Sequence, residues 1–135
     1  MPANLSKKAR VFAVLLVMNI AASIAHYADN IIRFAEYQDP SWLSPMRIDA
    51  FWFLMTPFGI AGYRLYKKGK ERAAFAANYV YGAMGMLVLA HYLVLPPWRW
   101  SASINALIML EAVCALALIA YTLRVQLRPT DLDPT

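Results

Sequence analysis

The pattern of apolar and polar positions divides the chain into four long apolar blocks separated by short polar stretches. Each block is about 20 residues long, the length at which a helix crosses a ~30 Å hydrocarbon core at 1.5 Å per residue. Because lipid offers no hydrogen-bond partner to an open strand edge, all four blocks are expected to be helices. The predicted fold is an all-α membrane protein, a bundle of four transmembrane helices running alternately up and down, with spans of about 9–29, 48–66, 73–95 and 101–123.

Composition agrees with this pattern. The chain has 135 residues, of which 61% are hydrophobic and only 16% charged, whereas soluble domains carry about 25% charged residues. One domain over residues 1–128 is expected, followed by a short disordered tail over 129–135. The single cysteine, Cys114, lies inside the fourth block, so neither a disulfide framework nor a thiolate metal cluster is expected. The first block has a basic start like a signal peptide, but its length and polar face favour a retained helix.

The basic residues predict the orientation of the bundle. Only Arg33, Arg47 and Arg99 are expected on one side of the membrane. Because basic residues concentrate on the cytoplasmic side, both termini and the 64–72 loop are expected there, in a bacterial inner membrane protein. The ten basic residues of the cytoplasmic side are Lys7, Lys8, Arg10, Arg64, Lys67, Lys68, Lys70, Arg72, Arg124 and Arg128.

Ionisable residues gather toward the outer side of the predicted bundle. The only two histidines, His26 and His91, each lie within about one turn of the outer end of a span. Glu111 lies about 15 Å inside the fourth span, near the midplane. A carboxylate there must be protonated or paired, so Glu111 is the strongest candidate for a functional residue. An outward-facing cavity with Glu111 at its floor would account for this one-sided distribution.

Two helix faces carry the remaining candidates. On the second span, Asp49, Trp52, Phe53 and Thr56 share a face, and Pro57 is expected to kink the helix. A polar stripe cannot face lipid, so the stripe of the first span must face partner helices or a wet cavity. It repeats at helical spacing through Asn19, Ser23, His26, Asn30 and Arg33, with Asp29 beside it.

Ordinary structural roles remain open for several of these residues. Asp29 and Asn30 fit the exposed end of the first span, and Asp49 fits a helix N-cap. His91 and Tyr92 fit an interfacial pair. Three further polar residues fit interhelical hydrogen-bond partners, namely Asn19, Ser23 and Asn78.

Short motifs around the second span resemble those of a known family. The stretch after the first span reads Phe34-Ala-Glu-Tyr-Gln-Asp-Pro40, the second span contains Pro57-Phe-Gly-Ile-Ala-Gly-Tyr63, and Lys68-Gly69 follows. Over roughly residues 26–95 the chain resembles the EXPERA superfamily, which includes emopamil-binding protein sterol isomerases and the sigma-2 receptor. The resemblance implies four helices with cytoplasmic termini and a cavity of carboxylates and aromatics that binds sterol-like or cationic amphiphiles.

The same resemblance suggests particular residues. By position, Asp39 matches the loop aspartate of the family, and Asp29 is the counterpart of its first-helix carboxylate. The glutamate expected on the second helix falls on Phe51, and the nearest acid is Asp49. The closely spaced histidine and glutamate of the enzyme branch are absent from any one helix. These departures favour ligand binding over sterol isomerisation.

The sequence leaves three functions open. The first is binding of a lipid, isoprenoid or sterol-like amphiphile in the outward-facing cavity, without a cofactor. Acid–base chemistry by Glu111 with His26 or His91 would add catalysis, so whether the chain is an enzyme stays open. The expected ligand-binding residues are Asp29, Asn30, Asp49, Trp52, Phe53, His91, Tyr92 and Glu111, with Trp98 as a further wall.

The second function is binding of b-type haem or a divalent metal by His26 and His91, which belong to diagonal helices of the predicted bundle. The third is a role as a subunit of a membrane complex or transporter, and a homodimer is also left open. The expected partners are membrane lipids and an amphiphilic small molecule, and no nucleic-acid motif is present.

Overall fold

The computed structural model describes residues 3–36 and 44–128, and within them every regular element is a helix. Asp39 and the predicted tail over 129–135 lie outside the described residues. The helices are α1 (Ala3–Ile32), α2 (Pro45–Lys67), α3 (Glu71–Met86), α4 (His91–Val94) and α5 (Ala102–Leu127). Short 3₁₀ turns occur at η1 (Phe34–Glu36), η2 (Leu87–Ala90) and η3 (Pro97–Arg99).

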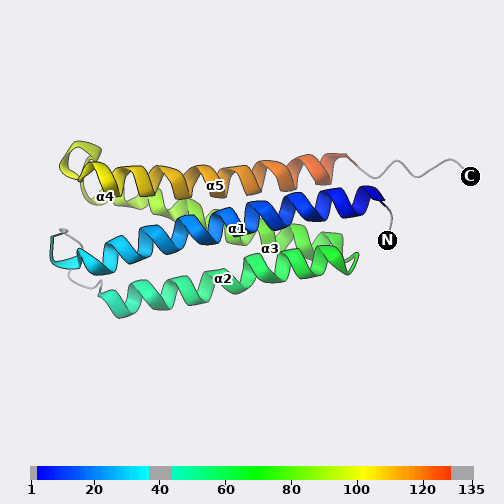
Figure 1. The fold of residues 1–135 in the computed structure, drawn as a ribbon, viewed down its shortest axis with the longest axis horizontal. Coiled ribbons are helices and arrows are strands. Elements are labelled where there is room, and N and C mark those ends of the chain that lie inside the picture. The colour runs from blue at the N-terminus through cyan, green and yellow to red at the C-terminus, as the bar shows by residue number, and fades with distance from the viewer. Residues whose placement is uncertain (1–2, 37–43, 129–135) are drawn as a thin grey trace, which may run out of the picture.

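The long helices form a bundle in which their axes run side by side (Figure 1). Helix α1 packs against α2 and α5, and α3 packs against the same two helices, so α1 and α3 lie on a diagonal. The start of α1, the end of α5 and the α2–α3 turn lie at one end, and the corner between α4 and α5 lies at the other (Figure 1). The predicted all-α, up-and-down four-helix bundle is thus the observed architecture.

Three stretches of the described chain are long and apolar enough to cross a membrane: Lys7–Ile32, Glu71–Val94 and Ala102–Leu127. This agrees with an integral membrane protein. Helix α2 has 23 residues and is long enough to cross, but it is not among the three. Its apolar residues are interrupted by the charged residues Asp49 and Arg64 and by Pro57.

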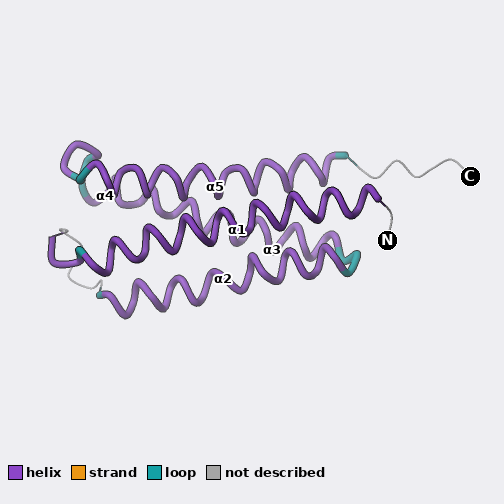
Figure 2. Tube along the Cα trace, viewed as in Figure 1, coloured by secondary structure: helices purple, strands orange, loops and turns teal. Residues whose placement is uncertain are grey.

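The third predicted span differs from a single regular helix. Helix α3 ends at Met86, and the chain continues through the 3₁₀ turn η2 and then the single turn of α4. Figure 2 colours the regular elements of the described chain as helix. A 3₁₀ segment has 3.0 residues per turn instead of 3.6. The direction in which His91 projects therefore cannot be extrapolated from the face of α3. Pro96 and Pro97 end the span, as the sequence indicates.

Local chemistry places the helix ends. The side chains of Ser44 and Ser101 accept hydrogen bonds from the backbone of the first turns of α2 and α5. Because Ser44 is the N-cap of α2, the interpretation of Asp49 as the cap is wrong. At the α2–α3 turn Gly69 has a φ of 71°, a conformation that a side chain would strain.

Close helix contact in the half of the bundle that holds the termini depends on Gly62. A Cβ added at Gly62 would overlap the side-chain amide of Asn78 and lie 3.3 Å from the carbonyl oxygen of Ala74. Asn78 is itself buried, and its Nδ2 has no hydrogen-bond partner among the described residues. Glycine at this position therefore sets the separation between α2 and α3.

We expect Gly62→Ala to lower the free energy of unfolding by about 1–3 kcal/mol, because the added methyl group must displace the Asn78 amide. Combining it with Asn78→Ala removes that obstacle, so the double variant should lose less than the sum of the single losses. Denaturant unfolding in detergent micelles measures the free energy of unfolding of the wild type, the two single variants and the double variant. Additive losses would contradict the contact.

Candidate functional site

The centre of the candidate site is a contact between two buried ionisable side chains on neighbouring helices. His26 Nδ1 on α1 lies 2.6 Å from Glu111 Oε2 on α5. Each residue is only 2% exposed. The sequence predicted that Glu111 needs either a proton or a partner, and the structure supplies His26 as the partner. The two residues are 85 positions apart and meet because α1 packs directly on α5.

The hydrogen-bonded chain continues from His26 toward the α4–α5 corner. The amide nitrogen of Asn30, one turn further along α1, lies 3.0 Å from His26 Nε2 and 3.5 Å from His91 Nε2. His91 Nδ1 in turn lies 2.9 Å from the carbonyl oxygen of Val88. We call the four residues Glu111, His26, Asn30 and His91 the polar cluster.

For neutral imidazoles, the hydrogen-bond partners of each ring decide which nitrogen carries the hydrogen. The Val88 carbonyl can only accept, so His91 Nδ1 carries the hydrogen and His91 Nε2 is an acceptor. A carboxylate of Glu111 likewise accepts from His26 Nδ1. Asn30 must then donate from Nδ2 to both rings, which fixes the orientation of its amide. Asn30 Oδ1 is left buried and has no hydrogen-bond partner in the described structure.

Aromatic rings pack against the two histidines of the polar cluster. The His26 and His91 rings meet edge to face with centroids 5.1 Å apart, and the Trp100 ring lies 5.6 Å from His91. Trp100 is buried, and its Nε1 donates to the carbonyl oxygen of Leu95 at 3.0 Å. The sequence did not single out this residue, because a tryptophan close to the end of an apolar span is typical of an interfacial belt.

A second hydrogen-bonded contact lies on α1 before His26, away from the α4–α5 corner. Trp52 Nε1 on α2 donates to Ser23 Oγ at 3.1 Å, and this hydroxyl donates to the carbonyl oxygen of Ile20 at 2.9 Å. The prediction that Ser23 is an interhelical hydrogen-bond partner is therefore confirmed. Trp52 is half-buried and contacts α1 at Ser23, one turn before His26.

The remaining candidate residues lie outside the polar cluster. Asp29 Oδ1 lies 3.4 Å from Arg33 Nε at the end of α1. Tyr92 is partly buried and donates its hydroxyl hydrogen to Asn105 Oδ1 at 2.9 Å. Asp49 is exposed, and Phe53 is 67% exposed, so both face away from the bundle interior. The structure therefore gathers only four of the expected residues into one cluster.

Both histidines of the haem or metal alternative contact other groups in the described structure. A haem held by two histidines needs both ring nitrogens directed at one iron from opposite faces. Here both Nε2 atoms face the amide nitrogen of Asn30. Within residues 3–36 and 44–128, no group of three or more histidine, cysteine, aspartate or glutamate side chains is placed to hold a metal ion.

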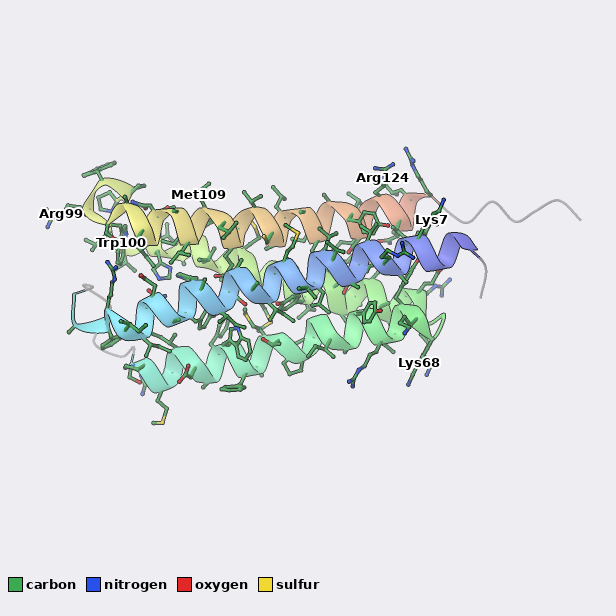
Figure 3. The ribbon with its side chains drawn as sticks, viewed as in Figure 1. Lys7, Lys68, Arg99, Trp100, Met109 and Arg124 are labelled. Atoms are coloured by element: carbon green, nitrogen blue, oxygen red, sulfur yellow. The ribbon has the colours of Figure 1, made fainter. Side chains whose placement is uncertain are left out.

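The two ends of the bundle differ in charge. Figure 3 shows Lys7, Lys68 and Arg124 at the end that holds the α2–α3 turn, and Arg99 with Trp100 at the opposite end. His91 and Trp100 belong to that opposite end, so the polar cluster lies in the half of the bundle away from most basic residues.

No family model, curated protein or solved structure matches the chain. The resemblance to the EXPERA superfamily therefore depends on the quoted motifs alone, and its loop aspartate, Asp39, lies outside the described residues.

We expect His26→Ala to lower the free energy of unfolding by about 3 kcal/mol, because Glu111 would stay buried without its partner. Glu111→Gln keeps an acceptor for His26 Nδ1 and should cost about 1 kcal/mol. Asp49→Asn, a control that removes an exposed carboxylate, should have almost no effect. Equal stability of His26→Ala and the control would rule out a stabilising pair.

Proposed function

We propose that the chain is an integral membrane protein with four membrane-crossing helices and both termini in the cytoplasm. Three apolar helices and the concentration of basic residues at one end support this topology. Helix α2 is proposed as the fourth span because it packs lengthwise against α1 and α3. In this arrangement the polar cluster lies toward the outer surface of the membrane, opposite the cytoplasm.

We further propose that the protein binds one amphiphilic molecule, a lipid, isoprenoid or sterol-like compound, at the polar cluster. The observation that carries this proposal is the unpartnered Asn30 Oδ1 beside the buried His26–Glu111 pair. A buried acceptor without a hydrogen bond costs about 1–3 kcal/mol. A hydroxyl or amine headgroup that donates to Asn30 Oδ1 would recover this energy, whereas a carboxylate or phosphate anion offers no hydrogen.

The surroundings suit the apolar part of such a ligand. Trp52, Tyr92 and Trp100 provide aromatic surface next to the few polar groups, a combination that is typical of small-molecule sites. Because His26 and Glu111 are 2% exposed, the headgroup reaches them only when the outer ends of the helices separate. The 3₁₀ turn η2 interrupts the third span close to the cluster and is the proposed hinge.

The pair also has the parts needed for proton transfer. His26 shares the hydrogen on Nδ1 with Glu111, while Nε2 is directed at Asn30. A ligand that displaced the Asn30 amide would meet His26 Nε2, a proton acceptor backed by a carboxylate. Acid–base chemistry on a bound amphiphile is therefore the catalytic form of the same proposal.

Lipid analysis of the purified protein tests ligand binding. We expect the wild type and the Asp49→Asn control to retain the same selected amphiphile in mass spectrometry. Asn30→Leu removes the buried acceptor, and Glu111→Gln removes the negative charge beside His26 Nδ1, so each should retain about tenfold less. An identical lipid mixture in all four folded samples would contradict a specific site.

The topology is tested with single cysteines in a Cys114→Ala background. We expect Ser103→Cys to react with a membrane-impermeant maleimide on intact bacterial cells, because the positive-inside rule places the start of α5 outside. Lys70→Cys should react only after the membrane is opened. Reaction of Lys70→Cys on intact cells would contradict cytoplasmic termini.

A further inference from the structure

A groove lies on the surface of α2, at the end of the bundle away from the polar cluster. The groove is open to the surroundings and has a volume of about 490 Å³. Its lining residues recur at helical spacing, so the groove follows one face of the helix. They are Pro57, Ile60, Ala61, Arg64, Leu65 and Lys68.

The length of the groove corresponds to one leaflet of a membrane. Pro57 and Lys68 are 11 residues apart, which is about 16 Å along a helix. The hydrocarbon core of a bilayer is ~30 Å thick, so one leaflet contributes about half of it. With Lys68 at the membrane surface, as proposed above, Pro57 lies near the midplane.

The groove is apolar along its length and basic at one end. Ile60, Ala61 and Leu65 line the stretch between Pro57 and the α2–α3 turn. Arg64 and Lys68 are exposed, and neither forms an ion pair with a carboxylate among the described residues.

The charged residues next to the basic end of the groove do not pair with Arg64 or Lys68 in the described structure. The adjacent Lys67 is directed elsewhere, with its Nζ 5.7 Å from the centroid of the Tyr63 ring. Glu71, in the first turn of α3, is the one described carboxylate near the turn, and it forms no ion pair with Arg64 or Lys68.

We propose that this groove binds one anionic phospholipid, with the phosphate between Arg64 and Lys68 and an acyl chain along Ile60, Ala61 and Leu65. Two cations at the surface end of an apolar groove complement an anionic headgroup that carries a chain of matching length. A free phosphate would use only the cations, and an apolar helix of a partner protein would leave them unpaired. The inference rests on the proposed membrane placement of α2 and is independent of the ligand at the polar cluster.

Native mass spectrometry of the whole chain in detergent tests the headgroup contact. Phosphatidylglycerol and phosphatidylcholine are added at equal concentration. We expect the wild type to retain phosphatidylglycerol preferentially. Arg64→Gln with Lys68→Gln should weaken its binding about tenfold, since both cations are removed. Arg124→Gln with Arg128→Gln removes the same charge at the same end and should retain it. Equal losses in the two double variants would overturn the proposal.

A second variant tests the acyl-chain contact. Ala61→Trp fills the groove and leaves both cations in place, so phosphatidylglycerol binding should fall while the protein stays folded. Inorganic phosphate at the same concentration should not displace the lipid. Unchanged binding in Ala61→Trp, or displacement by phosphate, would show a headgroup site without the groove and would overturn the proposal. Glu111→Gln should leave this binding unaltered, which separates the groove from the polar cluster.

Discussion

The contact between His26 and Glu111 is the constraint around which the half of the bundle opposite the termini is arranged. Both side chains are almost fully buried, and an unpaired carboxylate in such surroundings would be strongly unfavourable. Helices α1 and α5 must therefore meet in the register that joins Nδ1 to Oε2. That register also aligns the polar stripe of α1 with the bundle interior, where Ser23 receives the indole hydrogen of Trp52.

Asn30 extends this constraint to the third span. Its single amide nitrogen lies within reach of both imidazoles, so the positions of His26 and His91 depend on each other. A proton placed on either Nε2 would oppose the amide hydrogens and would require the Asn30 amide to turn, bringing Oδ1 toward the ring. The cluster therefore couples the charge of two histidines to the orientation of one amide.

The two halves of the bundle present different chemistry to their surroundings. The half opposite the termini buries a hydrogen-bonded cluster beside Trp100, and its unpartnered Asn30 Oδ1 suits a ligand that donates a hydrogen bond. The other half packs tightly through Gly62 and carries its basic residues on the surface, beside the groove of α2. Such a division suits a protein that holds a specific amphiphile at one membrane surface and contacts anionic lipid at the other. The proposed amphiphile site and the proposed lipid groove both require that α2 crosses the membrane.

The sequence alone determined the four helices, the uneven distribution of basic residues and the need of Glu111 for a partner, because these follow from apolar length and the cost of buried charge. It also indicated that His26 and Asn30 share one face of α1. Which histidine meets Glu111 was decided only by the tertiary structure, through the register of α1 against α5. The direction of His91 followed from a 3₁₀ turn, and the burial of Trp100 from the α4–α5 corner. A helical pattern specifies faces, but packing alone decides which faces touch and at what depth.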